Sequence, residues 1–163
     1  MREKIIEVLS AFPDGVATVL IAMIPITELR ASIPIAITQF GLNPITAMIY
    51  SVIGNVIAGA VVLLFVENIL YLFLARFSVL EKIWQKYIDR IHRNNKDKFE
   101  KWGAIALITF VAIPLPMTGI FTGAVAASIF QIKFKQAFPL LVVGSIISGI
   151  IVTLITVGVT NII

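Results

Sequence analysis

The chain has 163 residues, of which 59% are hydrophobic and only 13% are charged. Its mean hydropathy is +1.01, whereas soluble domains are only about 45 to 50% apolar. Three uncharged runs, residues 31–66, 103–132 and 136–163, each exceed the roughly 20 residues that cross a bilayer. The absence of cysteine and the single histidine exclude thiol chemistry, zinc sites and the common nucleophile triads. The composition predicts an all-α integral membrane protein that is not an enzyme, with no catalytic residue, metal or cofactor.

The first 75 residues are predicted to form three elements. Residues 1–12 place apolar and charged side chains on opposite helical faces, which is typical of a helix lying in the membrane interface. Residues 15–40 are apolar but contain Pro25 and Pro34, and proline breaks or kinks a helix. We therefore expect a re-entrant hairpin there, entering from outside, then a turn at residues 41–44 and a transmembrane helix from about Ile45 to Ala75.

The middle segment, residues 76–102, carries most of the positive charge. Eight of the thirteen basic residues lie there, namely Arg76, Lys82, Lys86, Arg90, Arg93, Lys96, Lys98 and Lys101. Basic loops next to apolar spans stay on the cytoplasmic side, so this charge indicates orientation and not nucleic-acid binding. Apolar residues between Leu80 and Ile91 recur at helical spacing, which predicts an amphipathic linker helix on the membrane surface.

The second half begins with another broken apolar segment. Pro114 and Pro116 interrupt residues 103–132, and the 11 residues before the break would form a helix of only roughly 16 Å. That length is about half a bilayer, which favours a second re-entrant hairpin over a straight crossing. A hairpin entering from the cytoplasm also keeps Lys133 and Lys135 on the basic side. A second transmembrane helix should follow, over about residues 136–163.

The two halves resemble each other at an offset of 89 to 90 residues. Gly54 and Gly59 align with Gly144 and Gly149, and Pro25 aligns with Pro114. Because one full crossing separates the two hairpins, the repeats are expected to be inverted, with both termini outside. We therefore predict a single membrane domain over 1–163, divided into repeat one (1–75), linker (76–102) and repeat two (103–163). The glycines are expected to allow close helix packing against the hairpins.

Glu28 and Arg30 are the strongest candidates for a substrate or proton site. They are the only charges between residues 15 and 66, and a charge at mid-membrane depth is costly unless it is paired or wet. A carboxylate can carry a proton, and a guanidinium can hold a phosphate or another anion with forked donors. Alternatively, the two side chains form a pair that only locks the hairpin.

Other candidate residues surround the two breaks. Prolines free backbone carbonyls, threonines add hydroxyls, and a helix starting at Gly119 would aim its N–H groups at the opposite hairpin tip. Asn55 belongs either to the site or to an interhelical hydrogen bond. The remaining site residues are Thr27, Pro25, Pro34, Pro114, Pro116 and Thr118.

Three motifs resemble a known family. They are Glu28-Leu-Arg30-Ala-Ser-Ile-Pro34, Gly54-Asn55, and Ile113-Pro-Leu-Pro-Met-Thr118-Gly119 followed by Thr122-Gly123-Ala-Val-Ala126-Ala127. Together they look like the small multidrug export family of prokaryotic membrane proteins. That family is similar to the DedA or SNARE-associated Golgi (VTT) superfamily, whose members resemble lipid carriers, flippases or scramblases. The resemblance implies a location in the prokaryotic inner membrane, where the charge pattern predicts that residues 76–102 are cytoplasmic.

The leading functional prediction is a transporter or lipid flippase of DedA-like type. It would move an amphipathic or anionic small molecule or lipid through a site between opposed re-entrant hairpins, with proton coupling left open. Its partners would be membrane lipid and this substrate, with no nucleic acid and with a homo-oligomer left open. The alternatives are a non-transporting membrane-organising or assembly protein and an intramembrane lipid-phosphate enzyme. The enzyme would need more than one acid or base, whereas the chain offers one mid-membrane Glu.

Overall fold

The computed structural model describes residues 12–76, 103–115, 118–130 and 132–160, except for the side chains of 67–76. Over these ranges the protein is all-helical and has no strand, which confirms the predicted class. Residues 1–11 and 77–102, where the two amphipathic helices are predicted, lie outside the described residues, and so does Pro116. The helices are α2 (Asp14–Ala22), α3 (Glu28–Thr38), α4 (Pro44–Arg76), Gly103–Ala112, α6 (Ile120–Ile129) and α7 (Phe134–Thr160).

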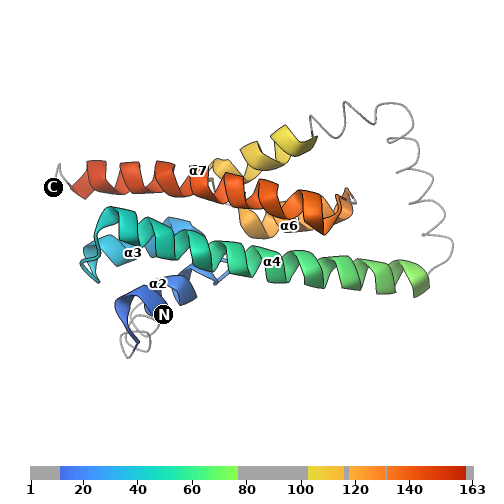
Figure 1. Ribbon diagram of the computed structural model, residues 1–163, viewed down its shortest axis with the longest axis horizontal. Helices are drawn as coiled ribbons and strands as arrows, with labels where there is room; N and C mark the ends of the chain where they lie inside the picture. Colours follow the sequence, from blue (N-terminus) through green and yellow to red (C-terminus); the bar gives the residue numbers. More distant parts are fainter. Residues whose placement is uncertain (1–11, 77–102, 116–117, 131, 161–163) are drawn as a thin grey trace.

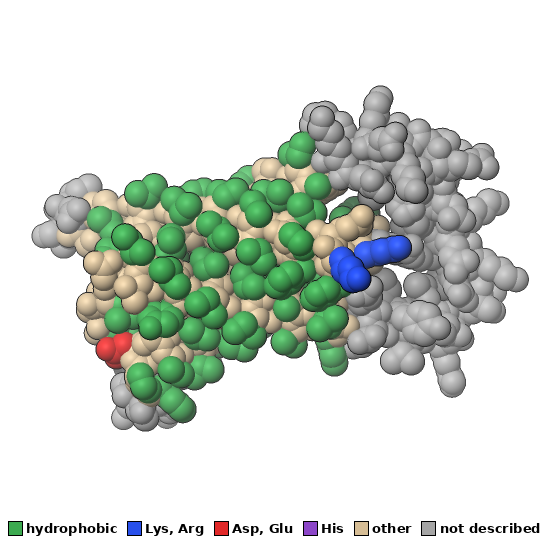
Figure 2. Space-filling model, in the orientation of Figure 1, with side chains coloured by type: hydrophobic (Ala, Val, Ile, Leu, Met, Phe, Trp, Pro, Cys, Tyr) green, Lys and Arg blue, Asp and Glu red, His purple; other side chains and the backbone are tan. Residues whose placement is uncertain are grey.

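Two long helices, α4 and α7, run side by side in opposite directions along the molecule (Figure 1). The segments Pro44–Val66 and Phe134–Thr160 are long and apolar enough to cross a membrane. Only 33% and 39% of their most apolar windows are buried, so most of their surface faces outward. Large apolar side chains such as Val61 and Leu154 are exposed on them. Figure 2 shows this apolar surface lying between basic side chains at one side and an acidic side chain at the other, which suits a protein solvated by lipid.

The short helices form two pairs at opposite ends of the long helices (Figure 1). Each pair, with the break between its two helices, is called a hairpin below. In the first pair, α2 runs inward to a break at residues 23–27, and α3 returns to the end where α2 began. In the second pair, Gly103–Ala112 runs inward from the other end, and α6 returns after a break that includes residues 113–115 and 118–119. The element order short, break, short, long therefore occurs twice.

Each break has a local chemical cause. Pro25 has no N–H, so the carbonyl of Ile21 loses its usual helical donor. The hydroxyl of Thr27 donates to that carbonyl instead, at 2.6 Å. In the second break, the Thr118 hydroxyl lies 2.7 Å from the carbonyl of Ile113. A threonine hydroxyl thus satisfies a backbone carbonyl where the helix is interrupted.

The long helices pack on the short ones through two glycines at equivalent positions. A Cβ added to Gly54 would collide with the backbone oxygen of Val19 in α2. A Cβ added to Gly144 would stand 3.1 Å from the backbone oxygen of Ile108 in the helix Gly103–Ala112. Both members of this contact recur 89 or 90 residues later, so this contact is repeated in the two halves.

The second pair of glycines packs differently in the two halves. Gly59 lies against Ile120 of α6, as expected for contact with a hairpin. Gly149 instead lies against Val52 and Met48, which belong to α4. The prediction that all four glycines face the hairpins is therefore wrong for Gly149. The reason is that α7 packs directly along α4 at this level.

Candidate functional site

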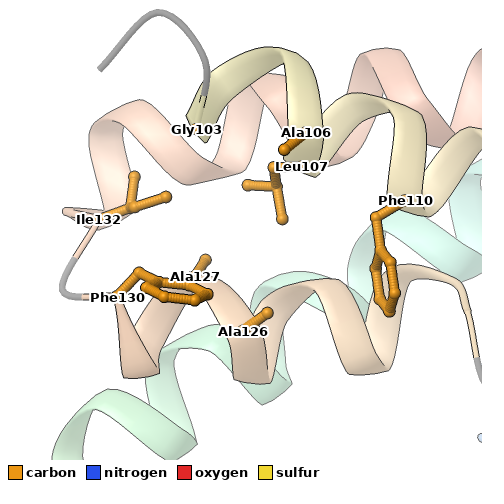
Figure 3. A pocket seen from close by; sticks show the side chains of 8 residues that line it. All are labelled: Gly103, Ala106, Leu107, Phe110, Ala126, Ala127, Phe130 and Ile132. Atoms are coloured by element: carbon orange, nitrogen blue, oxygen red, sulfur yellow. The ribbon is translucent and has the colours of Figure 1, made fainter. Parts of the chain in front are cut away.

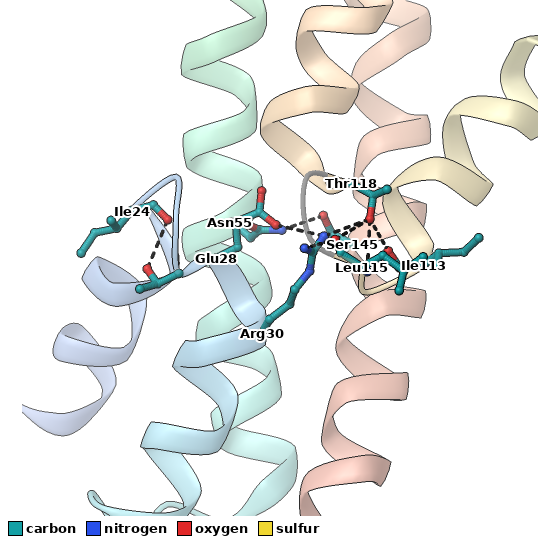
Figure 4. Close-up of polar contacts among 9 residues, drawn as sticks. Ile24, Glu28, Arg30, Asn55, Ile113, Leu115, Thr118 and Ser145 are labelled. Carbon is teal, nitrogen blue, oxygen red and sulfur yellow. Dashed lines mark hydrogen bonds and ion pairs between the residues drawn. The ribbon is translucent and has the colours of Figure 1, made fainter. Parts of the chain in front are cut away.

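The two breaks meet at the middle of the molecule through Arg30. This residue lies in the first turn of α3, directly after the first break. Its Nη1 donates to the backbone carbonyl of Leu115, and its Nη2 lies 3.3 Å from the hydroxyl of Thr118 (Figure 4). A cation from the first hairpin therefore binds polar groups in the break of the second hairpin, about 90 residues away in sequence.

Glu28 lies beside Arg30 and is almost fully buried. One carboxylate oxygen is 3.5 Å from Nη2 of Arg30. The carboxylate also accepts a hydrogen bond from the backbone N–H of Phe121, in the first turn of α6. No side chain at the N-cap position of α6 caps that helix, so Glu28 supplies an acceptor from the other hairpin. A negative charge is also favourable at a helix N-terminus.

Two unusual backbone conformations make this junction possible. Glu28 has a φ of 46°, which is rare for a residue with a side chain and is costly unless its surroundings hold it. Gly119, just before α6, has a φ of 143°. A Cβ at Gly119 would collide with the Glu28 carboxylate and would stand 2.8 Å from Arg30 Nη2. Only glycine therefore leaves room for the buried pair against the N-terminus of α6.

The predicted threonines have different positions. Thr118 joins the junction, since its hydroxyl contacts Arg30 and accepts from the N–H of Leu115 at 3.2 Å. Thr27 does not cross to the other hairpin. Its hydroxyl bonds to the carbonyls of Ile21 and Ile24, so it supports the break in its own hairpin.

The prolines shape the backbone without meeting at one point. Pro25 is exposed in the first break, and Pro114 is partly buried in the second. Pro34 lies inside α3 and is not part of a break. It lacks the N–H that would bond to the carbonyl of Arg30, so it frees that carbonyl next to the charged pair.

Asn55 joins the two long helices. Its Nδ2 donates to Oγ of Ser145 at 3.2 Å, and both side chains are buried (Figure 4). The interhelical alternative is therefore realised. Sequence reasoning missed Ser145, although it aligns with Asn55 in the internal repeat. It also missed the N–H of Phe121, for which no side-chain pattern gives a signal.

The junction has the chemistry of a small anion site. It combines a guanidinium, helix N–H groups and a hydroxyl, with one carboxylate already among them. Arg30 Nε and Asn55 Oδ1 are buried and have no hydrogen-bond partner among the described residues. Such atoms are costly unless something satisfies them. The Nε of Arg30 is a further donor suited to an anion, whereas the Oδ1 of Asn55 can only accept a hydrogen bond. Across the described ranges, no group of three His, Cys, Asp or Glu side chains is arranged to hold a metal ion.

Fold and site define a helical membrane protein built around a buried polar junction. The chain belongs to the family described as "putative small multi-drug export protein", whose model matches residues 28–151. The match begins at Glu28, directly after the first break, and includes the second break, all of α4 and most of α7. No curated protein and no solved structure matches the sequence.

Proposed function

We propose that this protein is a transporter that moves an amphipathic or anionic small molecule or lipid past the Glu28–Arg30 pair. The observation that carries the proposal is the contact of Arg30 with both Glu28 and the opposite break. A charge buried between apolar helices is costly, and in transporters such residues line the substrate path. The family description supports an export role. DedA-like lipid flipping is the narrower form of this proposal, based on sequence resemblance.

The proposed topology is an inverted repeat with two re-entrant hairpins. The repeated element order and the matched glycine contacts of Gly54 and Gly144 support it. The antiparallel course of α4 and α7 supports it as well (Figure 1). Residues 76–102 then lie in the cytoplasm of a prokaryotic cell, and the hairpin tips meet near the membrane midplane. Transporters built from such repeats place their sites at the repeat interface.

In the proposed mechanism, Glu28 acts as an internal occupant of the anion site. Its carboxylate uses Arg30 and the N–H of Phe121, the donors that a substrate anion would need. When a carboxylate oxygen of Glu28 takes up a proton, the attraction between that group and Arg30 is lost. The substrate anion then takes the place of the carboxylate beside Arg30. When Glu28 loses the proton again, its carboxylate returns to Arg30 and expels the substrate. The reaction breaks no bond of the substrate, so the protein acts as a carrier and not as an enzyme.

A flux assay tests the transport proposal. The protein is reconstituted into liposomes loaded with three amphipathic probes that share one apolar body and have an anionic, zwitterionic or cationic head. We expect protein-dependent flux of the anionic probe that responds to a pH gradient. Glu28→Gln should remove the response to pH, because an amide cannot exchange a proton. Asp14→Asn makes the same chemical change at an exposed position and should leave the response intact. If none of the probes moves, the non-transporting alternative replaces the proposal.

Cysteine accessibility tests the topology, because the natural chain contains no cysteine. Single variants Asp14→Cys and Gln39→Cys should react with an impermeant maleimide from one side of the membrane. Gly103→Cys and Lys133→Cys should react only from the other side, since each hairpin returns to the face it entered. If Asp14→Cys and Gln39→Cys react from opposite sides, the first pair of helices crosses the membrane and the re-entrant model is wrong.

A further inference from the structure

The two arms of the second hairpin line an apolar cavity of about 450 Å³ that is open to its surroundings (Figure 3). The cavity lies between the helix Gly103–Ala112 and α6, near the end where the hairpin begins and ends. Its lining is entirely apolar and includes Leu107, Phe110, Ala126 and Ile132. This cavity is separate from the Glu28–Arg30 junction, none of whose residues lines it.

The surroundings of the cavity restrict what can fill it. Protein interiors are packed as closely as organic crystals, so an empty space of this size forfeits many contacts. Water is a poor occupant, because an ordered water needs two or more polar partners and the lining offers almost none. In a protein solvated by lipid, the apolar material at hand is the acyl chain.

The charge beside the cavity identifies the kind of lipid. Lys133 and Lys135 are exposed and directly follow Ile132, which lines the cavity. Figure 2 shows basic side chains at one end of the apolar surface. In a bilayer, the end of an apolar surface meets the lipid head groups. Basic residues beside a pocket between membrane helices attract anionic head groups. Asp14 is an exposed acidic residue at the start of α2, at the other end of the molecule from the start of α7 (Figure 1).

We infer that an anionic phospholipid docks on the second hairpin, with one acyl chain between Gly103–Ala112 and α6 and its phosphate at Lys133 and Lys135. The lipid holds the two arms of the hairpin together from outside the proposed transport site. This inference requires only that the protein lies in a membrane, so it stands or falls independently of the proposed transport.

Native mass spectrometry of the delipidated, full-length protein tests the inference. The protein is titrated with phosphatidylglycerol or phosphatidylcholine of identical acyl chains. We expect one phosphatidylglycerol to bind at a concentration about tenfold lower than phosphatidylcholine, because two lysines contribute near the head group. Lys133→Gln combined with Lys135→Gln should abolish the preference and leave both lipids binding equally weakly.

Filling the cavity should remove the site without changing any charge. Ala126→Phe places a ring in the cavity, and Ala106→Phe does so from the opposite wall if the first variant fails to fold. Either variant should lower the affinity for both lipids by at least about tenfold. Val61→Phe, on the exposed surface of α4, is the control and should bind as the natural protein does.

Three outcomes would overturn the inference. The first is equal binding of the two lipids by the natural protein, and the second is unchanged binding by a folded cavity-filling variant. The third is a natural protein that binds neither lipid in the titration, which would assign the cavity to another segment of the chain or to a second copy.

Discussion

Replacing Arg30 with alanine should lower the free energy of unfolding by about 3 kcal/mol and abolish flux. Breaking a buried ion pair commonly costs about 3 to 5 kcal/mol, and the lower value applies because the Arg30 side chain is 22% exposed. The substitution leaves the Glu28 carboxylate buried without its cation and the carbonyl of Leu115 without its donor. Thermal unfolding in detergent measures the stability, and the liposome assay measures the flux.

A double variant separates a functional pair from a structural one. Glu28→Gln combined with Arg30→Gln removes both charges, so neither is left buried alone, and stability should return toward that of the natural protein. We expect this folded protein to be inactive, because it lacks both the guanidinium and the titrating group. Full activity of the folded double variant would show that the pair only locks the hairpin. Arg30→Lys should give a flux between that of the natural protein and that of the double variant, since an ammonium keeps the charge but lacks the planar fork of the guanidinium.

Gly119→Ala should destabilise the protein by about 3 kcal/mol or more and reduce flux. Its backbone has a φ of 143° with an extended ψ, a combination essentially restricted to glycine, and forcing another residue into it costs about 1 to 3 kcal/mol. The added Cβ would also collide with the Glu28 carboxylate, and overpacking adds about 1 to 3 kcal/mol. Thermal unfolding and the liposome assay again report the two effects.

Gly41→Ala is the matched control for Gly119→Ala. Gly41 also has a positive φ, 65°, but an added Cβ there would meet nothing within 4 Å. Its replacement should therefore cost only the backbone strain, about 1 kcal/mol. Equal losses for the two glycines would mean that the Cβ at Gly119 does not press on Glu28, and that the junction is looser than the structure indicates.

Much of the helical framework could be predicted from the sequence because prolines and charged residues mark the ends of its apolar segments. The expected span from about Ile45 to Ala75 corresponds to α4, and the expected span over 136–163 corresponds to α7 (Phe134–Thr160). The short stretch before Pro114 forms the helix Gly103–Ala112. Pro34 shows the limit of such reasoning. It lies inside α3, because a proline removes only one helical donor and the following turn still closes, with the Thr38 hydroxyl donating to its carbonyl.

The site was predictable only in part. The charges of Glu28 and Arg30 stand out in an apolar run, and the paired breaks predict that the two tips approach each other. The structure does bring Arg30 to Leu115 and Thr118. The bond from the Phe121 N–H to Glu28 could not be foreseen, because a backbone donor leaves no trace in a sequence. The positive φ of Glu28 was also unforeseeable, since only the assembled junction imposes it.

The capping of α6 by Glu28 also has a consequence for biosynthesis. Glu28 and Arg30 leave the ribosome about 90 residues before Phe121 and Leu115, the groups that satisfy them. In the proposed topology, the first hairpin would carry a charged pair into lipid without its backbone partners until the second hairpin is made, at a cost of several kcal/mol. The first hairpin should therefore wait near the membrane surface during translation and reach its final depth only together with the second. Its insertion is in this sense completed by the second hairpin.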